Sequence, residues 1–184
     1  MRELALHLLD IAENCVAAKA RNVHIAVRED TRQDILSMLI QDDGCGMTPE
    51  VVARVTDAFY TTRTTRKVGL GLPLLKLAAE ACNGFLRVES QVGQGTSITV
   101  QFQRSHIDRM PLGDLAATFL SLLITSPDIH WLFTYTVDDR LFEFDDEPVK
   151  QCLEGLPMTE PAVLAYLRET IQSGLAEIQP AGSY

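Results

Sequence analysis

The sequence predicts an α+β fold in which helices pack on a sheet in two layers. Along residues 1–104, stretches with a helical spacing of apolar residues alternate with pairs of strand-like stretches, in the order helix, two strands, short helix, loop, helix, two strands. Hydrophobic residues make up 46% and charged residues 22% of the 184, a composition typical of chains that fold around a core. We expect one domain over residues 1–104 and a small C-terminal α/β extension over residues 105–184.

The charge and the cysteine content narrow the class of protein. The formal net charge of −9 argues against a surface that neutralises phosphate backbones, so nucleic acid is not an expected partner. The four cysteines are widely spaced without a C-x-x-C pair, and neither a secretory signal nor an apolar run of about 18 residues is found. We expect a soluble cytoplasmic protein with reduced thiols and no membrane contact.

The first predicted helix covers residues 3–20. Its apolar residues make two neighbouring rows, Leu4, Leu8, Ile11 and Cys15 in one and Ala5, Leu9, Ala12 and Val16 in the other. Two strands follow at residues 23–27 and 35–40, joined by the turn DTRQD. The second strand is almost continuously apolar, as is typical of a strand that is covered on both faces.

The next elements lead to a second pair of strands. Pro49 begins a short helical stretch that ends near residue 57, and the segment TTRTTRK after it has no apolar periodicity, which indicates a loop. A second long helix is expected at residues 71–83. Strands at residues 86–88 and 98–102 flank a glycine-rich turn.

The extension is predicted to contain a helix at residues 112–124, strands at 129–137 and 141–144, and a final helix for which Thr159 is the N-cap. It is either a small second lobe or an extension that packs on the first domain. Its aromatic residues form either a core or a surface for a partner; they are Trp131, Phe133, Tyr135, Phe142 and Phe144.

Four segments of the first domain could carry chemistry. Glu3, His7, Asp10 and Asn14 form one polar row along the first helix, which is either a ligand site or simply a solvated edge. In DDGCG the carboxylates can accept a hydrogen bond from an exocyclic amine, and the glycines let a flat ring approach the backbone. VGLGLPLL places glycines before a helix whose N–H groups can face anionic oxygens, and GQGTSITVQF is a glycine turn that opens a strand.

Taken in order, these segments resemble the ATP-binding domain of the GHKL superfamily, which has the Bergerat fold and includes gyrase B subunits, heat-shock chaperone ATPases, sensor histidine kinases and mismatch-repair ATPases. LLDIAENCVAAKA is similar to the N box, DDGCGM to the first glycine box and AFYTTR to the F box. VGLGLPL is similar to the second glycine box, and GQGTSITVQF to the final glycine-threonine strand. The resemblance spans residues 1–104.

The resemblance implies ATP and Mg²⁺ as ligands. Asn14 matches the asparagine that holds Mg²⁺, Asp42 the aspartate that accepts the adenine amino group, and Thr96 the threonine that supports this contact directly or through water. The lid over ATP corresponds to residues 59–68, where cations could reach the γ-phosphate or be merely solvated. The further residues implied in nucleotide binding are Gly44, Gly46, Met47, Phe59, Arg63, Lys67, Gly69, Leu70, Gly71 and Leu72.

Three positions leave alternatives open. Asp10, the candidate catalytic residue, matches the place of a water-orienting glutamate and serves either as a weak general base or as an extension of the magnesium water shell. SHIDRMPL loosely resembles the phosphoacceptor box of sensor kinases, so His106 is either a phosphoacceptor or a connector residue. Cys45 is either a thiol whose oxidation gates ATP binding or a small variable loop residue.

We therefore expect a kinase or phosphotransfer component that uses Mg-ATP and acts on a separate protein partner. The alternative is an ATP-gated regulatory binding module with slow or no hydrolysis, and a stand-alone ATPase is third. A homodimer is compatible with the apolar extension but is not predicted by it.

Overall fold

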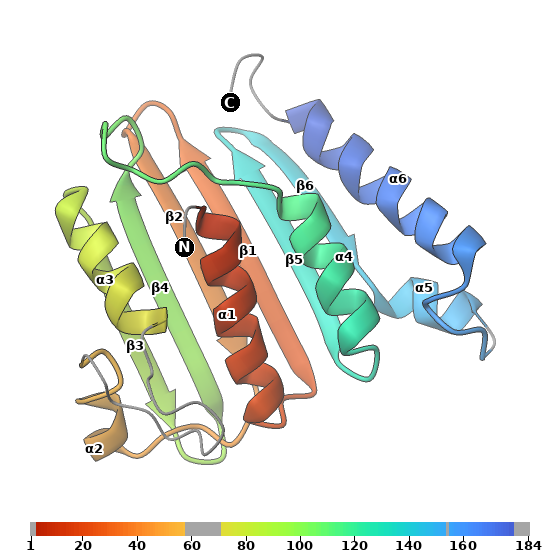
Figure 1. The fold of residues 1–184 in the computed structure, drawn as a ribbon, viewed down its shortest axis with the longest axis horizontal. Coiled ribbons are helices and arrows are strands. Elements are labelled where there is room, and N and C mark those ends of the chain that lie inside the picture. Colours follow the sequence, from red (N-terminus) through yellow and green to blue (C-terminus); the bar gives the residue numbers. More distant parts are fainter. Residues whose placement is uncertain (1–2, 58–70, 154, 179–184) are drawn as a thin grey trace.

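The computed structural model describes residues 3–57, 71–153 and 155–178, and these form a single six-stranded sheet with helices on one face (Figure 1). The strand order is β3-β4-β2-β1-β5-β6. The elements are α1 (Leu4–Ala17), β1 (Asn22–Asp30), β2 (Ile35–Asp42), α2 (Pro49–Val52), α3 (Gly71–Ala81), β3 (Phe85–Gln91), β4 (Gly95–Gln103), α4 (Leu115–Thr125), β5 (His130–Val137), β6 (Arg140–Asp145), α5 (Glu147–Cys152) and α6 (Pro161–Ile178).

The two-layer α+β sandwich expected from the sequence is confirmed. Figure 1 shows α3, α1, α4 and α6 side by side over the same face of the sheet. Side chains that point from the central strands toward these helices are buried, and those that point the other way are half-buried or exposed. β2 therefore has one fully covered face rather than the two expected from its apolar sequence, because its neighbours β1 and β4 shield the outward residues only in part.

Helix α1 is held at its N-terminus by a segment that lies more than a hundred residues away in the sequence. The side chain of Glu3 makes no capping hydrogen bond. Instead the backbone N–H groups of Leu4 and Ala5 donate to the carbonyl oxygens of Pro111 and Leu112, at 3.0 and 2.9 Å. These carbonyls satisfy donors that a helix start leaves without an intrahelical partner. The nucleotide-side helix predicted by the resemblance is thus tied to the connection that leads into α4.

The extension continues the sheet of the first domain. Strand β5 pairs in parallel with β1, from Asn22 opposite His130 to Glu29 opposite Val137, and β6 pairs antiparallel with β5. The sequence left open whether residues 105–184 form a small second lobe or pack on the first domain, and the structure shows that they pack on it. The division of the chain at residue 104 stays a prediction, since strands from both sides of it share one sheet.

The aromatic residues of the extension belong to its core. Trp131, Phe133, Tyr135 and Phe144 are buried, and Phe142 packs half-buried against the same cluster. The rings of Phe119 and Phe133 stack with their centroids 3.5 Å apart. Trp131 also donates its indole N–H to the carbonyl of Ser126 at 3.1 Å. Burial of large aromatic surface is the main stabilising contribution available here, so these residues are not an open surface for a partner.

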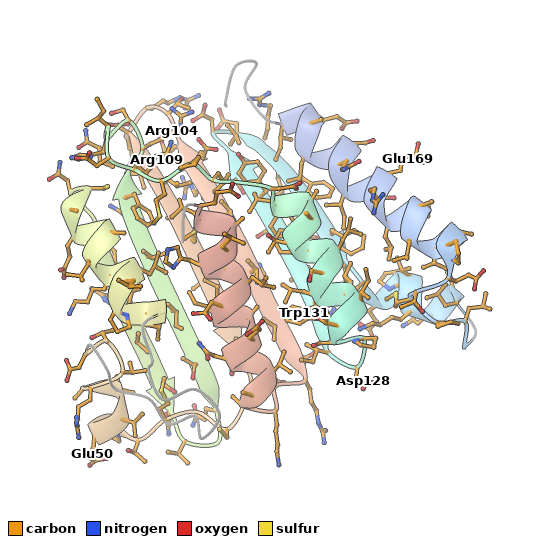
Figure 2. The ribbon with its side chains drawn as sticks, viewed as in Figure 1. Glu50, Arg104, Arg109, Asp128, Trp131 and Glu169 are labelled. Atoms are coloured by element: carbon orange, nitrogen blue, oxygen red, sulfur yellow. The ribbon has the colours of Figure 1, made fainter. Side chains whose placement is uncertain are left out.

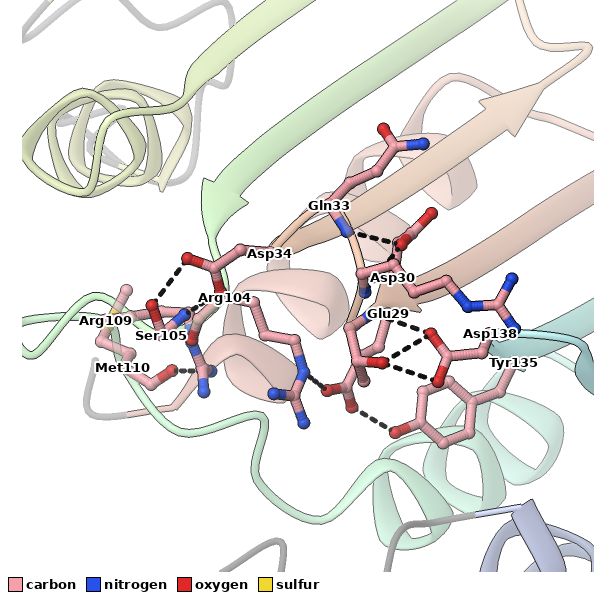
Figure 3. Close-up of polar contacts among 12 residues, drawn as sticks. Glu29, Asp30, Gln33, Asp34, Arg104, Ser105, Arg109, Met110, Tyr135 and Asp138 are labelled. Carbon is pink, nitrogen blue, oxygen red and sulfur yellow. Dashed lines mark hydrogen bonds and ion pairs between the residues drawn. The ribbon is translucent and has the colours of Figure 1, made fainter.

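A buried carboxylate joins the extension to the first domain (Figure 3). Glu29 accepts a hydrogen bond from the hydroxyl of Tyr135 at 2.5 Å and pairs with the guanidinium of Arg104 at 2.6 Å. Burial, and then the hydrogen bond to Glu29, raise the pKa of Tyr135. Arg109 in turn donates to the carbonyl of Arg104 at 2.6 Å, and Figure 2 shows both arginines beside the connection after β4. This cluster fixes the path of the chain between β4 and α4.

Among the described residues, no helix is both long and apolar enough to cross a membrane.

Candidate nucleotide-binding site

Three neighbouring strands bring a carboxylate and two hydroxyls into one row. In the register of the sheet, Thr96 on β4 lies opposite Asp42 on β2 and opposite Ser90 on β3. On β2 and β4 the residues two positions away from Asp42 and Thr96 are buried, and on β3 the residues in phase with Ser90 are half-buried whereas the others are exposed. Because side chains alternate along a strand, all three point toward the helix-covered face. The row lies at the end of the sheet where β2 ends and β4 begins.

Asp42 is held by its own loop. Its side chain is 9% exposed, and its Oδ1 accepts a hydrogen bond from the backbone N–H of Gly44 at 2.8 Å. Burial, followed by the negative charge of Asp42, raises the pKa of the neighbouring Cys15 thiol, which therefore stays protonated. In the described residues no cation forms an ion pair with Asp42. The carboxylate is thus positioned by the amide of Gly44, and the Cys15 thiol near it is neutral.

Ser90 links the two glycine-containing turns of the site. Its hydroxyl accepts from the backbone N–H of Met47 at 2.8 Å, donates to the carbonyl of Gly95 at 2.8 Å, and lies 2.9 Å from the hydroxyl of Thr96. Ser90 was not among the site residues predicted from the sequence. Its position follows from the tight turn after β3, because counting outward from Gln91 opposite Gly95 places Ser90 opposite Thr96.

The loop after β2 is anchored on both sides. The N–H of Cys45 donates to the carbonyl of Ala18 at 2.9 Å, and the carbonyl of Cys45 accepts from Gly93 at 2.8 Å. Gly95 has a φ of +102°, and a Cβ there would overlap the carbonyl of Asp42. Only glycine suits this point because the chain is in a left-handed conformation and the two strands approach closely. Gly44, Gly46 and Met47 are brought together with Asp42 and Thr96, as the sequence predicted.

The polar row of α1 faces the start of α3. Asp10 and Asn14 are half-buried, and a Cβ on Gly71 would overlap the carboxylate of Asp10. His7 is 3% exposed, and burial lowers its pKa. Asp10 therefore lies against the start of α3, and the row as a whole is half-buried or buried rather than a fully solvated edge. Leu72, the next residue of α3, is buried.

Five of the predicted site residues lie outside the described residues, and so does the predicted lid at residues 59–68. They are Phe59, Arg63, Lys67, Gly69 and Leu70.

His106 lies at the other end of the sheet from the Asp42 row. Thr96 is the second residue of β4, whereas His106 comes three residues after Gln103, the last residue of that strand. The seven residue steps from Thr96 to Gln103 span roughly 24 Å. The imidazole Nδ1 accepts from the backbone N–H of Asp108 at 3.2 Å. The phosphoacceptor role of His106 stays a prediction.

A second polar cluster lies beside the start of α5, at one wall of a cavity of about 410 Å³. His130, Asp145 and Asp146 place candidate metal-ligand atoms within 4.8 Å of one another. The ammonium of Lys150 lies 2.7 Å from Oδ2 of the fully buried Asp146, and His130 contacts Asp145 at 2.9 Å. Since Lys150 already supplies the compensating charge, we interpret the cluster as an ion-pair network that fixes α5.

The two-layer sandwich has a buried acidic strand end on its helix-covered face, and the family match assigns the class, the nucleotide-binding ATPase domains. Within that class the chain belongs to the family of histidine kinase-, DNA gyrase B-, and HSP90-like ATPases, whose model matches residues 1–106. The Bergerat fold and the GHKL membership expected from the sequence are thereby confirmed.

Two relatives with curated descriptions are sensor kinases. The chain is 34% identical over 87 residues to a probable C4-dicarboxylate sensor kinase of Bacillus subtilis, which covers 47% of this chain and 16% of the relative. It is 26% identical over 108 residues to a putative NtrY-like sensor histidine kinase of Rickettsia conorii, which covers 59% and 18%. The chain thus spans less than a fifth of the length of these relatives.

A solved structure of the N-terminal domain of a DNA repair protein shares the fold. The TM-score is 0.55 with 13% sequence identity, covering 79% of this chain and 52% of that one.

Proposed function

We propose that the chain binds Mg-ATP between α1, α3 and the Asp42 row and acts as a kinase or phosphotransfer component on a partner protein. The observation that carries this proposal is the juxtaposition of Asp42 and Thr96 at adjacent strand ends, beside a helix that presents Asp10 and Asn14. Family membership supports ATP as the nucleotide. The named relatives support a kinase type of activity.

At the adenine end, Asp42 would act through its charge and its fixed position. An ionised carboxylate only accepts hydrogen bonds, and the exocyclic amine of adenine only donates them. Because the Gly44 amide holds one carboxylate oxygen, the group needs no reorganisation to meet the base. Gly44 and Gly46 would lie beneath the ring, where the absence of side chains leaves room for a flat base.

At the phosphate end, Asn14 and Asp10 would hold Mg²⁺. Amide and carboxylate oxygens are the ligands this hard ion prefers, and both residues project from one side of α1, one helical turn apart. When bound, Mg²⁺ neutralises charge that develops on the phosphates. Gly71 lets the start of α3 approach Asp10 closely, so the backbone there could face phosphate oxygens.

The side chain at position 10 bears on whether ATP is hydrolysed by water or its γ-phosphate is transferred to a partner. Aspartate is one methylene shorter than the glutamate that orients water in hydrolytic relatives, and we propose that it mainly extends the magnesium water shell. In that case water is poorly activated for hydrolysis. The γ-phosphoryl group is instead transferred to an acceptor on the partner protein, and ADP remains.

The test is a binding and transfer series with ATP labelled on the γ-phosphate. The wild type should bind ATP with a dependence on magnesium, and Asn14→Ala should lose that dependence. Asp10→Asn should retain binding and lose less than about tenfold in phosphate release if the water-shell role holds. Label that stays on nucleotide or free phosphate in the presence of candidate partners would count against transfer, and absence of ATP binding at millimolar concentration would refute the proposal.

The alternative, an ATP-gated binding module, is favoured by one observation. The start of α1 is hydrogen-bonded to residues 111–112, so the helix that would contact nucleotide is coupled to the extension. If this alternative holds, adding ATP should change the protection of the Leu4 and Ala5 amides from hydrogen exchange, and no labelled phosphate should be transferred to a partner. Unchanged protection on ATP addition would exclude this alternative.

A further inference from the structure

We propose that Ser90 makes the hydroxyl of Thr96 a hydrogen-bond acceptor toward the nucleotide, so that the site selects a purine with a 6-amino group over one with a 6-oxo group. This inference deepens the proposed function and rests on it. Ser90 acts through Thr96 and does not itself contact the base in this scheme, so it is a positioning residue.

The Ser90 hydroxyl has a single proton and two lone pairs to share among three neighbours. The carbonyl of Gly95, 2.8 Å away, can only accept, so it takes that proton. The N–H of Met47, also 2.8 Å away, can only donate, so it occupies one lone pair of the Ser90 oxygen. One lone pair remains for the third neighbour, the Thr96 hydroxyl at 2.9 Å. Ser90 can therefore only accept from Thr96.

The direction of this hydrogen bond decides whether the Thr96 hydroxyl can donate or accept toward a ligand. A threonine hydroxyl has one proton, and here that proton points to Ser90. What Thr96 can offer to a ligand is then its lone pairs. The backbone groups of Met47 and Gly95 hold Ser90 from two sides, so rotation of its hydroxyl would break a bond to the main chain.

Asp42 completes the selection because it is the cross-strand neighbour of Thr96 on the same face. The pocket then offers two acceptors side by side. An exocyclic amine has two N–H donors and can satisfy both of them. A 6-oxo group brings a third acceptor, which leaves buried lone pairs facing one another and costs affinity.

The experiment compares the affinity of ADP with that of IDP, which carries the 6-oxo group, by calorimetry. The wild type should prefer ADP. Ser90→Ala frees the Thr96 proton to donate to the oxo group, so the preference for ADP should fall by about fivefold. Ser90→Thr keeps the hydroxyl and should keep the preference. Ser97→Ala is the matched control, because Ser97 is the next residue of β4 and points to the opposite face of the sheet.

A double-mutant cycle tests whether Ser90 acts through Thr96. Thr96→Val should lower the preference by a similar factor, and adding Ser90→Ala to Thr96→Val should change it no further. Equal weakening of ADP and IDP by Ser90→Ala, or additive losses in the double variant, would overturn the inference in favour of a purely structural role. Should Ser90→Ala melt below the assay temperature, Ser90→Cys replaces it, since a thiol is a weak acceptor.

The two levels of proposal fail differently. If the wild type binds neither nucleotide, the proposed function fails and takes this inference with it. If the wild type binds ADP and Ser90→Ala leaves the ratio unchanged, only the role of Ser90 is refuted.

Discussion

Two buried carboxylates at opposite ends of the sheet differ in their partners, and this difference separates a structural carboxylate, Glu29, from the one proposed to bind a ligand, Asp42. Glu29 meets a phenol and a guanidinium, so its charge is neutralised within the protein. Asp42 accepts a hydrogen bond from the Gly44 amide and lies near the protonated Cys15 thiol, and in the part of the chain that the structure describes no cation pairs with it. A buried charge without a counter-ion is costly, and such groups are typical of sites where a ligand supplies the missing partner. The difference teaches that partners, rather than burial alone, separate the two roles.

The largest effect on stability is expected at the structural carboxylate. Glu29→Ala leaves Arg104 and the Tyr135 hydroxyl without their partner, and this should lower the free energy of unfolding by about 3–5 kcal/mol. Thermal and urea denaturation measure the loss. Glu143→Ala, an exposed glutamate on β6, should change stability by less than about 0.5 kcal/mol. An equally small loss for Glu29→Ala would show that the cluster contributes little.

The opposite pattern is expected for Asp42. Asp42→Asn places N–H donors against the amine of adenine, and affinity for ADP should fall by about 100-fold. The melting temperature without nucleotide should stay within a few degrees of the wild type, because the substitution breaks no ion pair among the described residues and leaves the amide oxygen able to accept from Gly44. Titration calorimetry and melting curves with and without ADP separate these effects. A large loss of stability without a change in affinity for ADP would show that Asp42 has a structural role and contradict the proposed role in binding.

Tyr135 sharpens the comparison through pH. Its pKa is raised in the folded state, so the protein binds the phenol proton more tightly than the unfolded chain does. The stabilisation is therefore fully present below the ordinary tyrosine pKa of about 10 and declines as the pH rises above it. Tyr135→Phe should cost about 1–2 kcal/mol at neutral pH and flatten this alkaline decline. Urea denaturation from pH 8 to 11 tests the slope, and an unchanged slope in the variant would contradict the assignment.

The smallest effect is expected at Cys45. This exposed residue bonds to its neighbours through its backbone, so Cys45→Ser should alter neither ADP affinity nor stability by more than about 0.5 kcal/mol. Its thiol has room for oxidation, and comparison of ADP affinity before and after mild peroxide treatment tests the gating hypothesis. Loss of affinity in the wild type but not in Cys45→Ser would support gating, and equal behaviour would leave Cys45 a variable loop residue.

Much of the fold was predictable because it depends on local patterns. Helices α1 and α3 and the strands of the first domain follow from the spacing of apolar residues. Boundaries were less accurate. The helix expected at residues 112–124 begins at Leu115, because Asp114 caps it by accepting from the Ala117 N–H at 2.8 Å. The final helix begins at Pro161, so Thr159 stands one residue too early to be its N-cap.

The site was predicted in part. The row of Asp42, Gly44 and Thr96 came from motif order, and the structure brings these residues together. Ser90 lies in no glycine-rich segment, and its importance appears only when the register of β3 and β4 is known. The capping of α1 by residues 111–112 was equally hidden, since nothing local in either segment indicates the other.

By itself, the sequence determined which segments become helices and strands and which nucleotide chemistry the glycine boxes indicate, because periodicity and motif spacing act over a few residues. Only the tertiary structure decided that β5 joins the first domain beside β1, that Glu29 pairs with Arg104, and that the hydroxyls of Ser90 and Thr96 come into hydrogen-bond contact. These are contacts between residues distant in the chain. Their geometry depends on strand register and packing of the whole sheet, which no local pattern encodes.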